Sequence, residues 1–379
     1  MTTLFRRYER PGAARDPRAL DAVFESKTFP LVDGTSVTFA FRGPADEVRL
    51  RHWIHGLASS KPFRRLHGTD VWYLELELPE RSRLEYKLEV VRGGQRQLVQ
   101  DPLNPNMTHD PFGVNSVVHG TGYEVPDWTK VDPEAREGEI VEREIRSDAF
   151  GETRSFQVYL PARMRETRLY PLLVAHDGAD YLRFSGLKTV LDNLIHRLEI
   201  PPLIVALTES PDRLREYGND PRHADFLVEE LVPDLEAAYP ISTEPADRGL
   251  LGASLGAVAA LSTAWRHPGF FHNLLLQSGS FAFTDIGELD GGPAMDRVAE
   301  FVNEFREDPG RPAERLFVSC GTYEALIYYN RSMIPLLQST GMAVRYVEAR
   351  DGHNWENWRD RLREGLSWLF PGPLWMVYE

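Results

Sequence analysis

The sequence contains very little cysteine, and this scarcity limits the chemistry that the chain can use. Among its 379 residues only Cys320 carries a thiol, so an intramolecular disulfide is excluded. Cys320 lies in an apolar run with Leu316, Phe317 and Val318, and free cysteines in such surroundings are usually buried. We therefore predict a buried structural thiol rather than a reactive one.

Long apolar runs and an excess of positive charge are also missing. No segment approaches the about 18 consecutive apolar residues of a membrane-spanning helix. The N-terminal stretch is charged and has no apolar core, unlike a secretory signal peptide. The net charge of −14 argues against a nucleic-acid or an acidic membrane surface as partner. We expect a cytoplasmic protein with a small-molecule substrate and no nucleic-acid or membrane partner.

The N-terminal third of the chain has the pattern of short β-strands. Between residues 35 and 118 apolar and polar side chains alternate, as in the series Val37, Phe39, Phe41. Alternation with period two is typical of half-buried strands, and glycine and proline separate the runs. We predict a small antiparallel sandwich domain over residues 1–118. A segment rich in proline, glycine and aspartate follows, and we expect residues 119–138 to be a linker.

From residue 139 onward the pattern indicates a second domain that extends to residue 379. Two alternating segments first predict a β-hairpin. Six short, continuous apolar runs then alternate with helical segments: 171–176, 202–209, 248–254, 273–280, 315–321 and 343–349. This alternation predicts an α/β domain with a mostly parallel sheet that is covered on both faces. Residues 222–239 predict a helix with one apolar face, which Pro233 should kink.

The strongest functional signal is the pattern G-x-S-x-G at residues 252–256. An apolar run precedes it and an alanine-rich, helix-favouring segment follows, as in a nucleophile elbow. At such a strand-to-helix turn the flanking glycines relieve crowding, and the helix N-terminus favours developing negative charge. We therefore predict that Ser254 is a catalytic nucleophile.

A nucleophilic serine needs a base, which in turn needs an orienting acid, and the usual order after this elbow is Ser, acid, His. His353 lies in a glycine-containing loop just after the last apolar run, so we predict that it is the base. Glu324 follows the run 315–321 by three residues, where this arrangement delivers its acid. Asp351 is the alternative acid, but it is only two residues from His353 and would have to fold back on its own loop.

Acyl transfer also requires donors for the oxyanion. The amide that follows the nucleophile belongs to Leu255, and a second donor normally comes from the loop after an early strand. The turn 177–179 has that position, and we expect either Gly178 or Ala179 to supply the amide. Adjacent His176 and Asp177 are weak indicators of a metal, so we expect neither a metal nor a cofactor. The sequence leaves open whether the protein is a monomer or a homodimer.

The C-terminal 240 or so residues resemble the enterochelin (siderophore) esterases and the broader esterase D group of α/β-hydrolases. The matching motifs are HDGA at 176–179, GASLGAVAAL at 252–261, CGTYEALIYYN at 320–330 and DGHNWENWRDRL at 351–362. The resemblance implies an α/β-hydrolase fold and a triad of Ser254, Glu324 and His353. The N-terminal domain resembles the immunoglobulin-like early-set modules that precede the catalytic domain in such esterases.

The resemblance favours a serine esterase that acts on a catecholate siderophore. A ferric tri-catecholate is strongly anionic, and the arginines expected in loops are candidates to bind it: Arg183, Arg215, Arg222 and Arg331. Trp355 of the histidine motif is a further candidate for substrate binding. A carbohydrate-linked feruloyl or acetyl esterase with a sugar-binding N-terminal domain is the alternative. A non-catalytic binding protein is disfavoured, because all three triad residue types are present in order.

Overall fold

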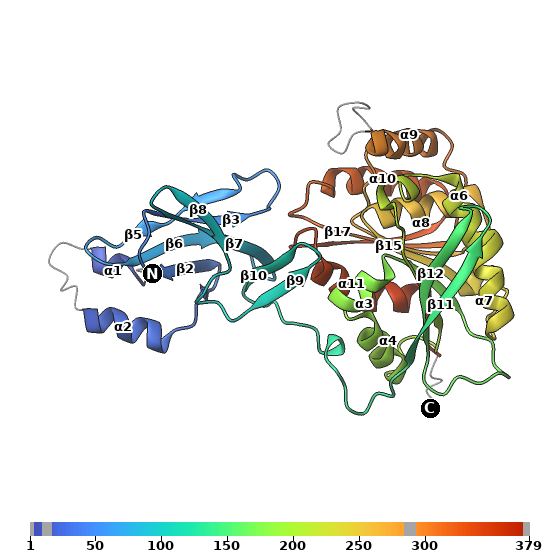
Figure 1. Cartoon of the computed structure of the whole chain (residues 1–379), viewed down its shortest axis with the longest axis horizontal. Helices are drawn as coiled ribbons and strands as arrows, with labels where there is room; N and C mark the ends of the chain where they lie inside the picture. The colour runs from blue at the N-terminus through green and yellow to red at the C-terminus, as the bar shows by residue number, and fades with distance from the viewer. Residues whose placement is uncertain (1–3, 10–16, 284–292, 374–379) are drawn as a thin grey trace. The chain divides into compact units, whose positions relative to one another are not determined.

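The computed structural model describes residues 4–9, 17–283 and 293–373 (Figure 1). None of the helices in these ranges is both long enough and apolar enough to cross a membrane. Cys320 is buried, with 1% of its surface exposed, so the prediction of a buried thiol is confirmed.

Contacts divide the chain into two compact units. The first comprises the residues up to Glu124 together with two short segments from the C-terminal half, Thr322–Ala325 and Ala349–Asn354. The second comprises the remainder of the chain. The boundary near Glu124 falls inside the segment predicted to be a linker, in which Trp128 is buried.

The first unit is an all-β structure with two sheets. One sheet has the strand order β1-β2-β6-β5, and the other has the order β4-β3-β7-β10-β9, with β8 also paired to β7. The strands are β1 (Leu31–Asp33), β2 (Ser36–Arg42), β3 (Glu47–His52), β4 (Ser60–Pro62), β5 (Arg64–Arg65), β6 (Val71–Glu77), β7 (Arg83–Arg92), β8 (Gln95–Val99), β9 (Met107–Asp110) and β10 (Gly113–His119). Every pair within these sheets is antiparallel.

Alternate residues of β2 point to opposite faces, and this separates two cores. Phe39 and Phe41 contribute to the core that β3 and β7 share, which includes Leu50 and Leu88. Ala40 contributes to a second core under two helices, α1 (Arg6–Glu9) and α2 (Pro17–Ser26). The alternating pattern predicted the strands, whereas nothing in it indicated these helices, because they cover the outer face of the sheet.

The second unit is built on one eight-stranded sheet with the order β11-β12-β14-β13-β15-β16-β17-β18. Its strands are β11 (Glu139–Ser147), β12 (Glu152–Leu160), β13 (Leu172–His176), β14 (Ile204–Thr208), β15 (Arg248–Ala253), β16 (Asn273–Gln277), β17 (Arg315–Gly321) and β18 (Ala343–Ala349). β11 and β12 form the predicted hairpin, and the strands from β14 through β13, β15 and β16 to β17 pair in parallel. Each of the six predicted apolar runs is a strand.

Helices cover both faces of this sheet, as Figure 1 shows for α9 and α10 on one side and α3 and α4 on the other. They are α3 (Gly178–Phe184), α4 (Leu187–His196), α5 (Arg213–Glu216), α6 (Pro221–Asp225), α7 (Val232–Ala238), α8 (Leu255–Arg266), α9 (Pro293–Glu307), α10 (Ile327–Ser339) and α11 (Trp355–Leu369). In β13, Leu173 and Ala175 pack in the core with α4 and α11, whereas Leu172 and Val174 pack in the core with α7 to α10. The predicted fold class is confirmed: a mostly parallel α/β domain follows a small all-β domain.

The predicted helix over 222–239 is present but divided. A π-helical segment, Phe226–Leu231, lies between α6 and α7. Pro233 is the second residue of α7, which continues without a break from the π-helical segment. The proline is therefore accommodated by a change of helix type just before it.

Candidate functional site

Ser254 occupies a strained turn between β15 and α8. Its backbone has φ 58° and ψ −120°, a conformation that non-glycine residues seldom adopt. Its amide donates to the Gln277 carbonyl at 2.9 Å, and its carbonyl accepts from the Ser280 amide at 3.2 Å. These bonds hold the turn against the end of the neighbouring strand β16, and the Ser254 side chain remains partly exposed.

The two glycines of the motif lie in crowded surroundings, and at Gly252 the backbone leaves no room for a side chain. A Cβ atom on Gly252 would lie 2.1 Å from the Gly256 carbonyl oxygen, a distance too short for any side chain at this position. A Cβ on Gly256 would lie 3.2 Å from the Cβ of His176 and 3.5 Å from a carboxylate oxygen of Asp177. The elbow is therefore packed directly against the turn that follows β13.

That second turn begins with a residue in the left-handed region. Asp177 has φ 54° and ψ 44° and precedes α3, which starts at Gly178. A Cβ on Gly178 would lie 2.5 Å from the Cα of Leu207 in β14, so only glycine fits. The Asp177 carboxylate accepts two hydrogen bonds of 2.9 Å from Arg213, which also donates to the Ala253 carbonyl at 3.4 Å. Arg213 thus joins this turn to the residue just before Ser254.

The two amides predicted for the oxyanion differ in their partners. The Ala179 amide donates to Glu209 at 2.6 Å, whereas the amides of Gly178 and Leu255 meet no protein acceptor within the described ranges. Both stand at the first position of a helix, where an amide has no intrahelical partner. Burial raises the pKa of Glu209 to about 7, and the charges of Asp177 and Asp180 add to this effect.

A pair of histidines lies buried behind the turn. The Nε2 atoms of His176 and His223 are 3.1 Å apart, and His176 Nδ1 lies 2.9 Å from the Leu251 carbonyl. Because a carbonyl only accepts, His176 Nδ1 carries the proton, and its Nε2 accepts from His223. Burial lowers the pKa of both histidines, and that of His223 falls well below the usual range. Both rings are therefore neutral supports of the turn, with their facing nitrogens already occupied.

Glu324 and His353 form a hydrogen-bonded pair. His353 Nδ1 and Glu324 Oε2 are 2.7 Å apart. The Glu324 side chain is 1% exposed and that of His353 is 38% exposed, so the carboxylate is covered while the ring reaches solvent. A proton on Nδ1 leaves Nε2 as the basic nitrogen of a neutral ring. The pair is thus arranged to accept a proton at Nε2 and to stabilise the resulting imidazolium.

Asp351, the alternative acid, has other partners. Its Oδ1 accepts from Arg83 at 3.2 Å, from the Gly352 amide at 2.7 Å and from the Asn354 side chain at 2.8 Å. Asp351 is buried, which raises its pKa to about 6 although the Arg83 charge opposes the shift. The carboxylate that hydrogen-bonds to the His353 ring is that of Glu324.

The three residues suggested for substrate binding have different surroundings. Arg183 is exposed and its guanidinium lies 4.9 Å from the Phe184 ring centre. Trp355 is 9% exposed and stacks edge to face with Tyr181 and Trp358 in the core under α11. Most of the Trp355 indole is therefore part of the core, whereas Arg183 presents a free face to solvent.

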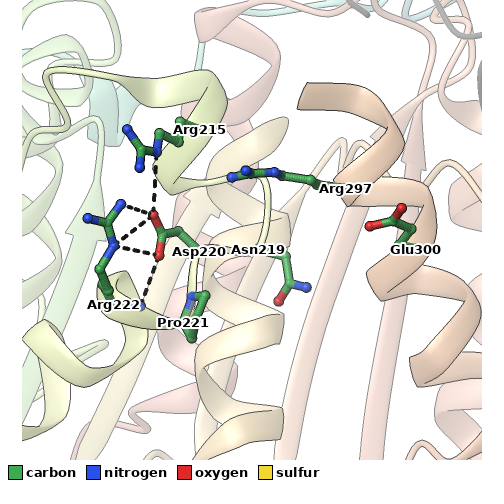
Figure 2. A pocket seen from close by; sticks show the side chains of 7 residues that line it. All are labelled: Arg215, Asn219, Asp220, Pro221, Arg222, Arg297 and Glu300. Carbon is green, nitrogen blue, oxygen red and sulfur yellow. Dashed lines mark hydrogen bonds and ion pairs between the residues drawn. The ribbon is translucent and has the colours of Figure 1, made fainter. Parts of the chain in front are cut away.

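Arg215 lines a charged pocket of about 360 Å³ (Figure 2). Its lining residues are Arg215, Asn219, Asp220, Pro221, Arg222, Arg297 and Glu300. Asp220 lies 3.9 Å from Arg215 and accepts from the Arg222 amide at 3.0 Å, and Arg297 extends toward the Asn219 segment from α9. Burial alone would raise the pKa of Asp220, but hydrogen bonds from Arg222 outweigh it and keep the pKa below its usual range. The pocket lining thus contains three guanidinium groups and two carboxylates.

Sequence reasoning missed Arg213, His223 and Glu209, which support the turn. Each is distant in sequence from Asp177, and none belongs to a recognisable motif. The pairing of His176 with His223 bridges 47 positions, a separation that no local pattern reports.

Known proteins resemble this chain over both units. The iron(III) enterobactin esterase of Escherichia coli O6:H1 is 25% identical over 370 residues, covering 87% of this chain and 90% of that protein. The ferric enterobactin esterase of Salmonella typhimurium has the same fold, with a TM-score of 0.76 and 20% identity over 92% of this chain and 98% of that one. A ferulic acid esterase from Anaeromyces mucronatus matches with a TM-score of 0.55 and 17% identity, over 64% of this chain and 94% of that one.

A family model described as "Putative esterase" matches residues 147–369, more than half of the chain. The matched region holds the strained turn at Ser254, the turn after β13 and the Glu324–His353 pair. The chain therefore belongs to this esterase family and is a carboxylic ester hydrolase.

Proposed function

We propose that the protein is a serine esterase of the enterochelin type, which hydrolyses the ester bonds of a catecholate siderophore through an acyl-enzyme. The observation that carries this proposal is the extent of the likeness. Similarity to the enterobactin esterases includes the N-terminal β domain, whereas the ferulic acid esterase matches about two thirds of the chain. The feruloyl or acetyl alternative leaves the first domain without a counterpart.

The first chemical step would use Ser254, His353 and Glu324. His353 Nε2 takes the Ser254 hydroxyl proton while the oxygen attacks the ester carbonyl, and Glu324 holds the ring by its Nδ1–H. Chain geometry supports this grouping, because Ser254, Glu324 and His353 follow β15, β17 and β18 of one sheet. Catalytic groups of open α/β sheets gather at the carboxyl ends of their strands.

The oxyanion would be stabilised by two helix-starting amides. Leu255 supplies one, and we assign the other to Gly178, because the Ala179 amide already donates to Glu209. Both amides stand at helix N-termini, where the dipole favours negative charge. Collapse of the tetrahedral intermediate transfers the His353 proton to the leaving alkoxide and leaves an ester on Ser254. Water, deprotonated by His353, then releases the acid and restores the serine.

The arginine-lined pocket is proposed to bind the negatively charged substrate. A tri-catecholate complex of ferric iron is anionic, and Arg215, Arg222 and Arg297 provide guanidinium donors that suit oxygen anions. Arg183 is a further candidate because its head group is exposed. Trp355 would act mainly by packing beneath the site, since most of its ring is covered.

A substrate panel tests the proposed function directly. Wild type should hydrolyse ferric and iron-free catecholate trilactones with much higher kcat/KM than feruloylated sugars, and Ser254→Ala should lose about 10⁴-fold or more on every ester that wild type cleaves. Product release is measured by chromatography, with circular dichroism as a control for folding. Preference for feruloylated sugars would support the alternative, and Ser254→Ala activity within tenfold of wild type would exclude Ser254 as nucleophile.

Two carboxylate variants test the identity of the acid. Glu324→Gln should lower kcat by about 10²- to 10⁴-fold with little change in KM, because its bond to the imidazolium strengthens in the transition state. Asp351→Asn should cost less than about tenfold, since Asp351 accepts from Arg83, Gly352 and Asn354. Both variants are compared on one activated ester. The reverse ranking would assign the acid to Asp351.

The pH dependence of Glu209→Gln tests the oxyanion turn. The pKa of Glu209 is about 7, so its negative charge beside the turn appears as the pH rises through that value. This charge opposes a developing oxyanion, whereas glutamine keeps an acceptor for the Ala179 amide without the charge. The ratio of kcat/KM for the variant to that for wild type should therefore increase as the pH rises through about 7. A constant or falling ratio would separate Glu209 from oxyanion stabilisation.

A further inference from the structure

The loops that carry Glu324 and His353 are hydrogen-bonded to each other. The Thr322 amide donates to the Ala349 carbonyl at 2.7 Å, and the Tyr323 amide donates to the Asp351 carbonyl at 3.1 Å. These bonds lie immediately before Glu324 in one loop and before His353 in the other. The two loops therefore form one structural element, which we call the acid–base element (Thr322–Ala325 and Ala349–Asn354).

The acid–base element belongs by its contacts to the first unit, with the sandwich strands. The His55 amide donates to the Tyr323 carbonyl at 2.8 Å, and the hydroxyls of Ser82 and Tyr323 are 2.6 Å apart. The Arg83 amide donates to the Arg350 carbonyl at 2.9 Å. The loop after β3 and the start of β7 thus bond to both halves of the element.

The Arg83 side chain also contacts the acid–base element, and its charge is buried there. It is 1% exposed, and burial of a guanidinium is unfavourable unless its donors are paired. Its partners are Glu85 at 2.9 Å, Asp351 at 3.2 Å and the Asn354 side-chain oxygen at 2.9 Å. Asp351 and Asn354 flank His353 in the chain on its two sides.

The hydrogen bonds of Asp351 connect Arg83 to the residues on both sides of His353. One carboxylate oxygen accepts from Arg83, from the Gly352 amide and from the Asn354 side chain. Arg83 in turn donates to Asn354, so the side chains that flank His353 in the chain bind the same guanidinium. A domain that served only to cover a surface would not need a buried charge at this point.

From this arrangement we infer that Arg83 is a positioning residue for the acid–base pair, through which the N-terminal β domain takes part in catalysis. The inference rests on the proposed function, in which Glu324 and His353 serve Ser254. Arg83 touches neither the reacting atoms nor the triad side chains in these contacts. It acts by holding Asp351 and Asn354, and with them the loop from which the His353 ring must meet the nucleophile.

The test compares Arg83→Met with Val90→Ala on one activated ester. Arg83→Met retains bulk but removes the donors, and kcat should fall about 10- to 100-fold with KM within about twofold, because small misplacements of catalytic groups cost such factors. Val90 lies in the sandwich core, 2% exposed, and makes none of the contacts to the acid–base element described above. Val90→Ala should lower the melting temperature of the domain and leave kcat unchanged.

A double variant separates positioning from stability. In Arg83→Met the Asp351 carboxylate stays buried without its ion-pair partner, which should lower thermal stability. The double variant Arg83→Met/Asp351→Asn removes that charge, so thermal stability should recover. If Arg83 positions the loop, kcat should stay low in the double variant although the fold is restored. Arg83→Lys should lie between wild type and Arg83→Met, because an ammonium group keeps the charge but not the planar fork.

The outcomes distinguish this inference from the proposed function. Arg83→Met with kcat within threefold of wild type, recovery of kcat together with stability in the double variant, or an equal loss in Val90→Ala would each overturn the positioning role. Loss of activity in Ser254→Ala with any of these results would leave the triad proposal intact. Retained activity in Ser254→Ala would instead refute the triad itself.

Discussion

The turn at Ser254 is the constraint on which the rest of the catalytic unit depends. A chain that leaves β15 and enters α8 within one residue must place that residue at positive φ, and it brings Gly252 against the Gly256 carbonyl. Strain of this kind costs of the order of 1–3 kcal/mol and persists only when the surroundings enforce it. Here the end of β16, the turn after β13 and the Arg213 contact to Ala253 enforce it. The packing that holds Ser254 therefore also positions the Leu255 and Gly178 amides, which the proposed mechanism uses as oxyanion donors.

In the proposed mechanism the catalytic residues come from both units. Ser254 and the helix-starting amides belong to the second unit, whereas the segments with Glu324 and His353 group by contacts with the first. In the proposed mechanism each catalytic cycle depends on the first unit for the orientation of its base. This dependence would act through Arg83 of β7. Its buried charge is compensated by ion pairs with Glu85 and Asp351.

The sequence allowed the sandwich, the strands of the α/β sheet and the general fold to be predicted. Continuous apolar runs identified the parallel strands because both faces of that sheet are covered, and alternation identified the strands of the sandwich. Glycine spacing predicted the turn at Ser254, because steric crowding at such a turn selects glycine at nearby positions of the sequence. Position after a strand pointed to Glu324, and the structure gives its carboxylate a hydrogen bond to His353.

Other features depend on contacts between distant segments and could not be predicted in this way. Arg83 lies 268 positions from Asp351, and Arg213 lies 36 positions from Asp177. Neither arginine differs in its local sequence from a surface charge. The helices α1 and α2 cover the outer face of a sheet, which the alternation marks only as the less apolar face. Pro233 predicted a disturbed helix, but nothing in the local sequence predicted its π-helical form.

The most direct test of the account is the identity of the residue that carries the acyl group during turnover. Wild type and His353→Ala are mixed with an activated ester, quenched in acid within the first turnover and digested for peptide mass spectrometry. The account predicts an acyl adduct on Ser254 in wild type and none in His353→Ala on the same time scale. An adduct on Ser280, whose hydroxyl lies 3.2 Å from that of Ser254, or product formation without any adduct would contradict it.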